Sequence, residues 1–320
     1  MIESHDLAPH ILVADVNGLQ ARFGLAERAQ APASVSVVDC TSQEQLIALL
    51  TQACAAFNGP VLGAAIAAPG PNLGGVIKLT HSDMTLEAEV IANQLGLHRL
   101  HLINNFTARA LAVPLLAPEA LEPIGGGSPH RDAPVGAVGP SETGLGMSIL
   151  YPDGFVGWTA AAAEGGHVDL AAANDREADI IRVLRGLHDH VSAEHVLSGQ
   201  GVLDVALAVS TLAGAPQRPA NIQALLDAAD AGDAVALETF QLVSGWLGAV
   251  CGNLVLTAGA RSGVYLISTT VLSWGDRLDR AVARHRFEAK GRMAAYLRDV
   301  PFYLVNDPNC GLLGLTTLFG

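Results

Sequence analysis

The feature that most constrains the fold is an order of segments that occurs twice along the chain. Short apolar runs of strand length lie close together, as in hairpins, and then alternate with stretches of helical character. Such alternation is typical of mixed α/β sheets with helices packed on their faces. The first occurrence predicts strands at residues 10–16, 21–26, 34–39, 61–68 and 101–104, and helices at 42–57, 85–95 and 106–115.

The same order restarts after a stretch rich in Gly and Pro, residues 122–140, which we interpret as a linker or a flexible flap. A chain of 320 residues, at about 150 residues per domain, also indicates two domains. The second occurrence predicts strands at residues 146–151, 155–160, 264–268 and 301–305, and helices at 175–188, 193–196, 202–213, 221–229, 234–257, 277–285, 291–298 and 311–319.

Composition argues against several classes of function. The formal net charge is −13, and such an acidic chain repels phosphate backbones, so nucleic acid is not an expected partner. The chain contains two lysines, Lys78 and Lys290, and neither follows the glycine pattern of a P-loop. The four cysteines form no C-x-x-C pair, so no structural metal is expected.

The N-terminal residues 1–6 lack the basic start and apolar run of a signal peptide. The uncharged stretch Thr239–Ala260 is long enough to span a bilayer. Polar side chains such as Gln241 and Asn253 interrupt this stretch, which favours a buried core helix. We therefore expect a cytoplasmic protein with reduced cysteines and no membrane partner.

Four polar segments interrupt the apolar pattern and carry the candidate chemistry. In Asp15–Arg22, an acidic residue at a strand end precedes a glycine turn, which can hold a metal ion and offer N–H groups to phosphate. The alternative for this segment is an ordinary Asn-Gly hairpin. In Asn104–Thr107, two adjacent carboxamides can bind a polyol, and a helix N-cap at Asn105 is the alternative interpretation.

The other two polar segments lie in the second predicted domain or at its start. Gly139–Gly146 is a glycine-rich turn that can approach phosphate oxygens, or a plain loop. Glu164–Asp169 combines Glu and His around two glycines and could serve a metal, a sugar or a turn, and Glu194 adds a further carboxylate. The run His188–His190 lacks a further ligand at suitable spacing, so a metal is not favoured there.

Together these segments resemble the bacterial glucokinase family of the hexokinase and actin-like ATPase superfamily. The resemblance covers essentially the whole chain and keeps the order of the motifs. A related sugar-kinase family with a cysteine-rich zinc loop is disfavoured, because the sequence contains no such loop. The matching segments are Asn104 with Phe106–Ala108, Glu164–Asp169, Ser192–Glu194 with Val196–Gly199, and Gly311–Gly314.

The resemblance implies a two-domain α/β fold of the actin-like ATPase, or ribonuclease H-like, type, with a sugar-binding cleft between the domains. Residues 1–115 plus 306–320 would form the small domain, and residues 116–305 the large one. The resemblance also implies a homodimer that transfers the ATP γ-phosphoryl group to the 6-hydroxyl of glucose with Mg²⁺.

The family's functional residues can be carried over position by position. The resemblance assigns the sugar, a glucose-like hexose, to Asn104, Asn105, Glu164, His167 and Glu194. It assigns ATP and its phosphates to Asp15, Asn17, Gly18, Thr143, Gly144, Ser268 and Thr269, and it gives Asp15 to Mg²⁺ as well.

The sequence departs from the family pattern in the half that handles phosphate. Asn105 stands where the family has its catalytic aspartate, and an amide cannot take a proton at neutral pH. Three further segments are altered: Asn17, Leu19 and Gln20 replace Gly, Thr and Asn, Ser141-Glu142 replaces one glycine, and Ser268-Thr269 replaces a Gly-Gly pair.

These departures lead to three hypotheses. The first is a protein that binds glucose or a related hexose while phosphoryl transfer from ATP is weak or lost, a sugar-binding pseudokinase. The second is an active ATP-dependent glucokinase, because phosphoryl transfer relies mainly on positioning and electrostatics and can survive the loss of a base. The third is a structural subunit without a ligand. The sequence alone ranks them in this order.

Overall fold

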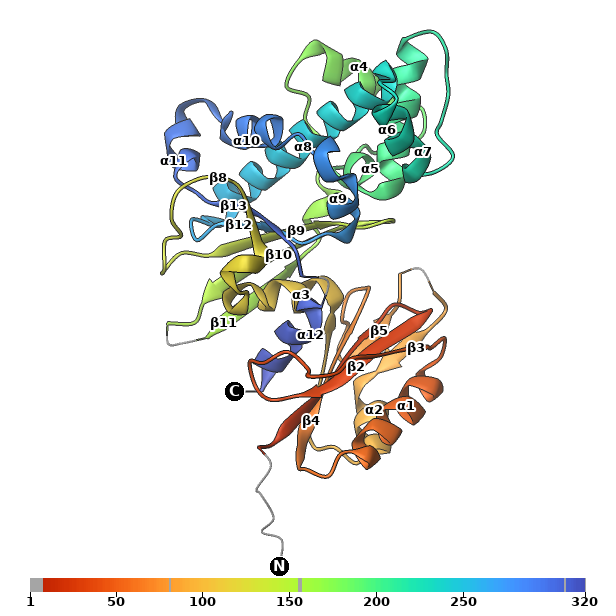
Figure 1. Ribbon diagram of the computed structural model, residues 1–320, viewed down its shortest axis with the longest axis vertical. Coiled ribbons are helices and arrows are strands. Elements are labelled where there is room, and N and C mark those ends of the chain that lie inside the picture. The colour runs from red at the N-terminus through yellow and green to blue at the C-terminus, as the bar shows by residue number, and fades with distance from the viewer. Residues whose placement is uncertain (1–7, 81, 155–156, 308, 320) are drawn as a thin grey trace, which may run out of the picture. The chain divides into compact units, whose positions relative to one another are not determined.

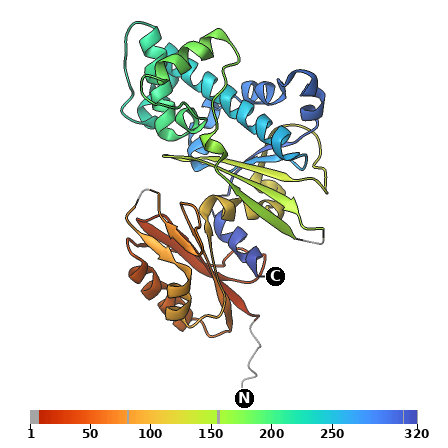
Figure 2. The same cartoon turned by 180° about the vertical axis from the view of Figure 1, so that it is seen from behind.

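The computed structural model describes residues 8–80, 82–154, 157–307 and 309–319. The chain divides into two compact units: unit 1 is Met1–Ala117 with Asp307–Gly320, and unit 2 is Pro118–Asn306. Strands and helices alternate in both (Figures 1 and 2). The segment without signal-peptide character, residues 1–6, lies outside the described residues.

Unit 1 contains a five-stranded sheet in the order β3-β2-β1-β4-β7 and a two-stranded ribbon, β5-β6. The strands β1 and β2 form an antiparallel hairpin, whereas β1, β4 and β7 run parallel. The elements of unit 1 are β1 (His10–Val16), β2 (Gln20–Ala26), β3 (Ser36–Asp39), α1 (Gln43–Ala56), β4 (Val61–Ala68), β5 (Val76–Lys78), β6 (Thr85–Glu87), α2 (Ala88–Leu95), β7 (Leu100–Asn104), α3 (Asn105–Leu111), η1 (Val113–Leu115), α12 (Cys310–Leu315) and η6 (Thr316–Leu318).

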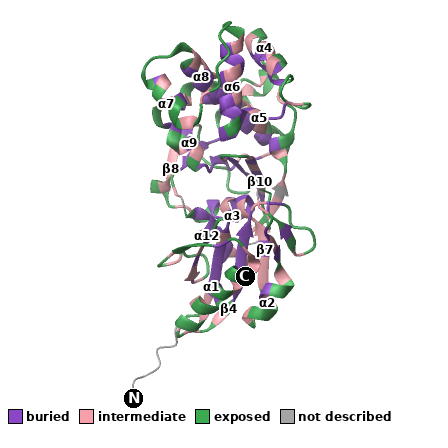
Figure 3. Ribbon diagram, turned by 90° about the vertical axis from the view of Figure 1, so that its right-hand side faces the viewer, coloured by how far each residue is buried: buried purple, intermediate pink, exposed green. Residues whose placement is uncertain are grey.

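The strands β1 and β4 are mostly apolar, as expected for strands whose sheet is covered on both faces. Successive side chains of β1 point to opposite faces. Leu12 and Ala14 join α1 and α2 in one buried cluster, while Ile11 and Val13 join α3 and α12 in another. Figure 3 shows the buried strands between helices that expose their outer sides.

Unit 2 contains a six-stranded sheet in the order β11-β10-β9-β12-β13-β8. Its strands are β8 (Leu121–Gly125), β9 (Val135–Pro140), β10 (Leu145–Pro152), β11 (Trp158–Ala163), β12 (Val264–Leu266) and β13 (Phe302–Val305). Its helices are η2 (Pro118–Ala120), η3 (Gly165–His167), α4 (Asp175–Leu184), α5 (Glu194–Leu197), α6 (Gly199–Leu212), α7 (Ile222–Asp230), α8 (Ala234–Ala258), α9 (Thr269–Trp274), η4 (Gly275–Arg277), α10 (Arg280–Glu288), η5 (Gly291–Met293) and α11 (Ala294–Arg298).

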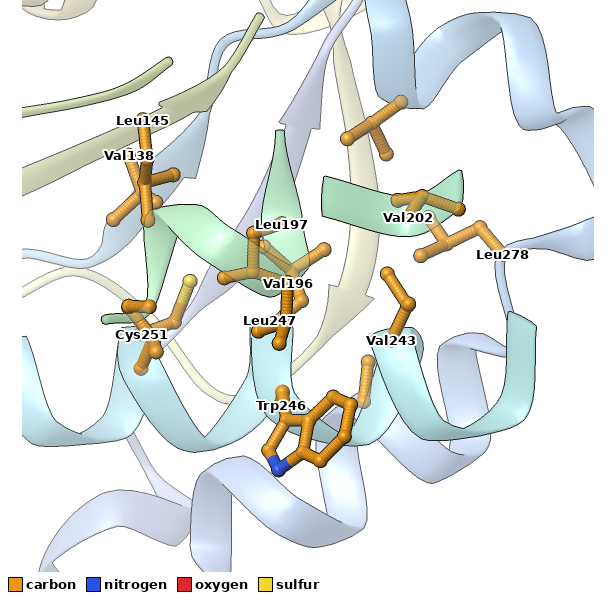
Figure 4. Close-up of a cluster of buried hydrophobic side chains, with 14 of the residues drawn as sticks. Val138, Leu145, Val196, Leu197, Val202, Val243, Trp246, Leu247, Cys251 and Leu278 are labelled. Carbon is orange, nitrogen blue, oxygen red and sulfur yellow. The ribbon is translucent and has the colours of Figure 1, made fainter. Parts of the chain in front are cut away.

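The core of unit 2 forms around α8. Trp246, Leu247 and Cys251 of this helix belong to the same buried cluster as Val196 and Leu197 of α5 (Figure 4). By length and composition α8 could cross a membrane, but 61% of its most apolar window is buried inside the unit. This burial agrees with the interpretation of the uncharged stretch as a core helix.

The Gly- and Pro-rich stretch 122–140, interpreted from the sequence as a linker or a flap, is irregular only in its middle, residues 126–134. Its first residues belong to β8, which pairs with β13, and its last six form β9, in the middle of the sheet between β10 and β12. All six residues of β9 are buried. Glycines and prolines signalled a loop, but Val135, Ala137 and Val138 supply the apolar contacts that hold a central strand.

Several element boundaries also differ from the predictions. The helix expected at 85–95 begins as the strand β6, because Thr85–Glu87 pairs with β5 before the helix starts. The helices expected at 106–115 and 311–319 each end in a separate 3-10 turn. The strand expected at 155–160 is β11, Trp158–Ala163, and residues 155–156 lie outside the described residues.

Candidate functional site

Three of the predicted sugar residues lie together in unit 2, and we call Glu164, His167 and Glu194 the hexose group. The His167 ring lies between the two carboxylates: its Nε2 is 3.9 Å from Glu164 Oε2, and its Nδ1 is 3.8 Å from Glu194 Oε1. The Glu164 and His167 side chains are 71% and 60% exposed, whereas that of Glu194 is 22% exposed. Glu164 and His167 therefore present polar atoms to a ligand, while the Glu194 carboxylate is more shielded from solvent.

Backbone hydrogen bonds bring the two segments of the hexose group together. The amide of Leu170 donates to Val191 O at 3.0 Å, and that of Ala193 donates to Val168 O at 3.1 Å. Glycine is required at residue 166, because a Cβ there would lie 2.3 Å from Leu145 O. The two glycines of the motif thus allow the 3-10 turn η3 to lie close against the start of β10.

Glu194 is fixed by the start of β10. One carboxylate oxygen, Oε2, accepts a 2.9 Å hydrogen bond from the Leu145 amide, and the other faces His167. Glu194 also begins helix α5, where the helix dipole favours a negative charge. The Glu194 carboxylate is therefore linked to Leu145, the residue that follows the glycine-rich turn.

The predicted phosphate turn, Ser141–Gly144, joins β9 to β10. Its ends are closed by a 2.8 Å hydrogen bond from the Ser141 amide to Gly144 O, and the Gly144 amide donates to Ser141 Oγ at 3.0 Å. Glu142 and Thr143 are exposed. The turn is compact because its own serine satisfies the amide of its glycine.

This turn also covers the first turn of helix α6. The amide of Gly199 donates to Ser141 O at 2.9 Å, and the amide of Gln200 donates to Glu142 O at 3.0 Å. The next amide, of Gly201, donates to Ser198 Oγ. The helix amides that could bind a phosphate are therefore satisfied by the protein itself.

The predicted adenosine segment, Ser268-Thr269, lies where β12 leads into α9. The buried Ser268 hydroxyl donates to Pro140 O and accepts from the Val271 amide, so it caps α9 and ties this helix to the end of β9. Thr269 is exposed. The serine that replaces a family glycine thus has a structural role in this chain.

In unit 1, the partly buried Asp15 lies opposite Arg22 in the β1–β2 hairpin. Burial raises the pKa of the Asp15 carboxyl above its usual range, while Arg109 and Arg22 oppose that rise. Arg22 donates to the Asn309 side chain, which holds it beside the start of α12. Burial thus disfavours the charged form of Asp15, and the two arginines offset this effect only in part.

The turn of this hairpin, Asn17–Gln20, is the first predicted phosphate segment, and we call it the phosphate hairpin. The hairpin itself is confirmed. Asn17 Oδ1 accepts from the Leu19 amide at 3.0 Å and from the Gln20 amide at 2.8 Å. Gly18 has a positive φ of 86°. A side-chain oxygen of the protein thus occupies two amides that a phosphate oxygen could otherwise use, and Leu19 projects into solvent, 71% exposed.

The two adjacent asparagines follow β7 and differ in role. Asn104, and not Asn105, is the N-cap of α3: its Oδ1 accepts from the amides of Phe106 and Thr107 at 2.8 and 3.2 Å. Its Nδ2 donates to Gly70 O at 3.1 Å. The carboxamide of Asn105 makes no hydrogen bond to another residue in the described part of the chain, so it is free for a ligand.

Sequence reasoning missed Arg109 and Asn309. Arg109 lies one helical turn after Asn105 on α3, and its charge acts on both Asp15 and Cys310. The spacing of four residues from Asn105 was the available signal, because residues i and i+4 share a helix face. The role of Asn309 depends on the return of the C-terminal segment to unit 1 and has no local signal.

The residues fit Mg²⁺ better than they fit the phosphates. Mg²⁺ in nucleotide sites commonly uses one or two carboxylates together with substrate phosphates, and Asp15 supplies one such carboxylate. No cluster of three or more His, Cys, Asp or Glu suited to a metal occurs among the described residues. In the phosphate hairpin and the Ser141–Gly144 turn, side chains of the protein already accept from the amides of Leu19, Gln20 and Gly144.

Comparison with known proteins supports the same family. The family model described as Glucokinase matches residues 12–319. A "Glucokinase-like protein" of Caulobacter vibrioides is 37% identical over 95% of each chain. A "Glucokinase" of Chromobacterium violaceum is 39% identical over 95% of this chain and 87% of the relative.

A solved structure shows the same architecture. The crystal structure of a glucokinase from an Antarctic psychrotroph superposes with a TM-score of 0.86 at 26% identity, covering 98% of this chain and 99% of the other. The two-domain α/β fold of actin-like ATPases, expected from the resemblance, is therefore confirmed.

Proposed function

The chain belongs to the glucokinase family, and from this premise we propose that it phosphorylates the 6-hydroxyl of glucose or a closely related hexose with ATP. The observation that carries the proposal is the hexose group, in which the His167 ring lies within 4 Å of both the Glu164 and the Glu194 carboxylates. This was the second hypothesis from the sequence, and membership of a family of glucokinases favours it over the first.

The hexose group has the chemistry that a polyol requires. Ionised carboxylates accept hydrogen bonds from sugar hydroxyls, and the His167 ring can donate or accept. Glu194 is held by the Leu145 amide, so its free oxygen keeps one direction. A ligand bound here would meet one anchored acceptor, Glu194, and one exposed acceptor, Glu164.

Asn105 is proposed to orient the attacking hydroxyl by hydrogen bonding, without taking its proton. Its free carboxamide suits this task, and an amide cannot act as a base at neutral pH. When bound, Mg²⁺ and ATP would supply the phosphoryl group and neutralise its charge, with Asp15 as the metal ligand. We expect the reaction to be slow, since a general base typically contributes about 10²–10⁴-fold to a rate.

The proposal is tested by product identification. Purified protein is incubated with ATP, Mg²⁺ and ¹³C-labelled glucose, and hexose 6-phosphate is followed by NMR. The matched pair of variants is Glu194→Gln, in the hexose group, and Glu119→Gln, on the exposed η2. Product is expected from the wild type and from Glu119→Gln, with a large loss in Glu194→Gln. Equal product from both variants would overturn the assignment of the site.

A second candidate function is hexose binding without phosphoryl transfer. The specific observation in its favour is that the protein satisfies its own phosphate-binding amides, through Asn17 in the hairpin and through Ser141 and Glu142 at α6. Glucose binding by calorimetry together with no product above the enzyme-free control supports this candidate.

We further propose that the protein is a cytoplasmic homodimer. Light scattering of the purified protein can test the dimeric state.

A further inference from the structure

Unit 2 contains a cavity of about 660 Å³ that is separate from the side chains of the hexose group. Figure 1 shows the elements that enclose it, the strands β10 and β11 and the helices α8 and α10. Its wall is mostly apolar, with Met147 and Ile149 from β10, and Val250 and Leu254 from α8. A volume in this range is typical of small-molecule sites.

One end of the cavity carries an amine without an acidic partner. Lys290 Nζ donates to Ala249 O at 3.0 Å and to Asn253 Oδ1 at 2.7 Å, and both acceptors are neutral. Across the described residues, no carboxylate lies within ion-pair distance of this amine. Burial, and to a smaller degree the nearby Arg286, lower the pKa of Lys290.

Two other ionisable side chains in the wall, Arg286 and Asp169, have partners within the protein. Arg286 forms an ion pair with the buried Glu177, which also accepts from the indole of Trp246. Asp169 Oδ1 lies 2.6 Å from His190 Nε2. Lys290 is therefore a cavity amine that has no carboxylate partner among the described residues, and such an amine can pair with an anion.

We propose that this cavity binds a small amphipathic anion, with an apolar body against β10 and α8 and a carboxylate paired with Lys290. The apolar wall would stabilise the body by burial. The carboxylate would supply the charged partner that Lys290 lacks, and an ion pair with hydrogen bonds is stronger than a bond to a neutral acceptor.

The cavity also adjoins the segments that carry the hexose group. Its wall includes Gly165, next to Glu164, and Ala193, next to Glu194. Met147 lies so close to Gly165 that a Cβ there would be 2.5 Å from the Met147 sulfur. A ligand that moves Met147 therefore acts on the backbone of the hexose group, and we extend the proposal to coupling between the two ligands.

The coupling rests on the hexose binding proposed above, whereas the anion site does not. The probes are 4-phenylbutyrate and its neutral analogue 4-phenylbutanol, titrated separately into the full chain by calorimetry. The carboxylate is expected to bind roughly tenfold more tightly than the alcohol, as for hydrogen bonds to a charged group. Equal affinities, or no binding of either probe, would overturn the site.

The chain offers a matched control for the charge. Lys290→Gln is expected to abolish the preference for the carboxylate, and Lys78→Gln, which changes the other lysine of the sequence on the exposed end of β5, is expected to keep it. Ala289→Trp fills the mouth of the cavity from an exposed position and should block both probes without removing Lys290. A carboxylate preference that survives Lys290→Gln contradicts the proposal.

Two further readouts separate the possible failures. Saturating 4-phenylbutyrate is expected to change the glucose dissociation constant by at least about fivefold, the lower end of common coupling effects. An unchanged glucose affinity removes the coupling and leaves the anion site, and an absence of glucose binding counts against the proposed function alone. If Ala289→Trp converts a dimer to a monomer in light scattering, a second copy of the chain covers the cavity and the anion proposal is wrong.

Discussion

In the hexose group, the Glu164 carboxylate makes no hydrogen bond to another described residue, and one oxygen of Glu194 faces His167 at 3.8 Å. In the phosphate hairpin, the amides of Leu19 and Gln20 both donate to Asn17 Oδ1. The first region leaves its polar atoms available to a ligand, and the second satisfies them internally. Turn amides need hydrogen-bond acceptors. In this hairpin the Asn17 side chain is the acceptor, in place of a ligand oxygen.

The comparison shows how one substitution can change a binding loop without changing its fold. The β1–β2 hairpin keeps its register, and Asp15 remains opposite Arg22. The Asn17 side chain stabilises the turn through the same amides that a ligand would use. We expect a lower affinity for phosphate, because the ligand would have to displace an existing hydrogen-bond acceptor.

The largest expected effect is a combined repair of the phosphate region. Asn105→Asp, Asn17→Gly and Leu19→Thr, with Ser141-Glu142 replaced by one glycine, supply a base and free the hairpin and α6 amides. Since a positioned base contributes about 10²–10⁴-fold, kcat/KM for ATP-dependent glucose phosphorylation should rise by that order. Steady-state kinetics measures it, with glucose affinity as the control for correct folding.

A combined variant that binds glucose normally and gains no activity would contradict this prediction. The rate would then not be limited by Asn105, the phosphate hairpin or the Ser141–Gly144 turn.

The second effect concerns the hexose group. Glu164→Ala should weaken glucose binding by about 1.5–3 kcal/mol, the usual worth of hydrogen bonds to a charged acceptor. Calorimetry measures this loss, and Glu119→Ala, on the exposed η2, is the matched control. Unchanged glucose affinity in Glu164→Ala would show that this carboxylate does not contact the sugar.

A smaller effect is expected for the base position alone. Asn105→Asp should raise kcat less than about tenfold, because misplaced ATP by itself can cost about 10²-fold and hides most of the gain. Asn58→Asp adds the same charge at an exposed loop residue and should leave kcat unchanged. Full recovery in Asn105→Asp would mean that the phosphate hairpin does not limit the reaction.

The smallest effect is expected at the Ser141–Gly144 turn. Glu142 is exposed, and its repulsion of phosphate should resemble a surface charge interaction of about 0.2–1 kcal/mol. Glu142→Gln should therefore lower KM for Mg·ATP by up to about fivefold. Screening should shrink the difference between variant and wild type at high salt, and a salt-independent difference would point to a change in the turn instead.

The sequence predicted local features of the fold well and long-range features poorly. The strand at 61–68 and the hairpin at Asn17-Gly18 follow from apolar runs and turn residues, and both are confirmed. The strands β8 and β9 were missed because they lie largely within the stretch 122–140, whose glycines and prolines signal a loop. Their pairing with β13, β10 and β12 depends on partners far away in the sequence.

The candidate site divides in the same way. The sequence supplied Glu164, His167 and Glu194 through their motifs, and the structure brings them together in unit 2. The sequence did not show that Asn17 satisfies the hairpin amides, or that Asn104 rather than Asn105 caps α3. Such choices depend on side-chain rotamers and local hydrogen bonds, which residue types alone leave open.

The most direct test of the account is the turnover number of the wild-type protein with saturating glucose, ATP and Mg²⁺. We predict saturable, glucose-dependent transfer at a rate well below the range of about 1–100 per second usual for kinases. Turnover within that range would contradict the claim that the protein's own side chains impair its phosphate region. Glucose binding with no turnover at all would contradict the proposed kinase activity.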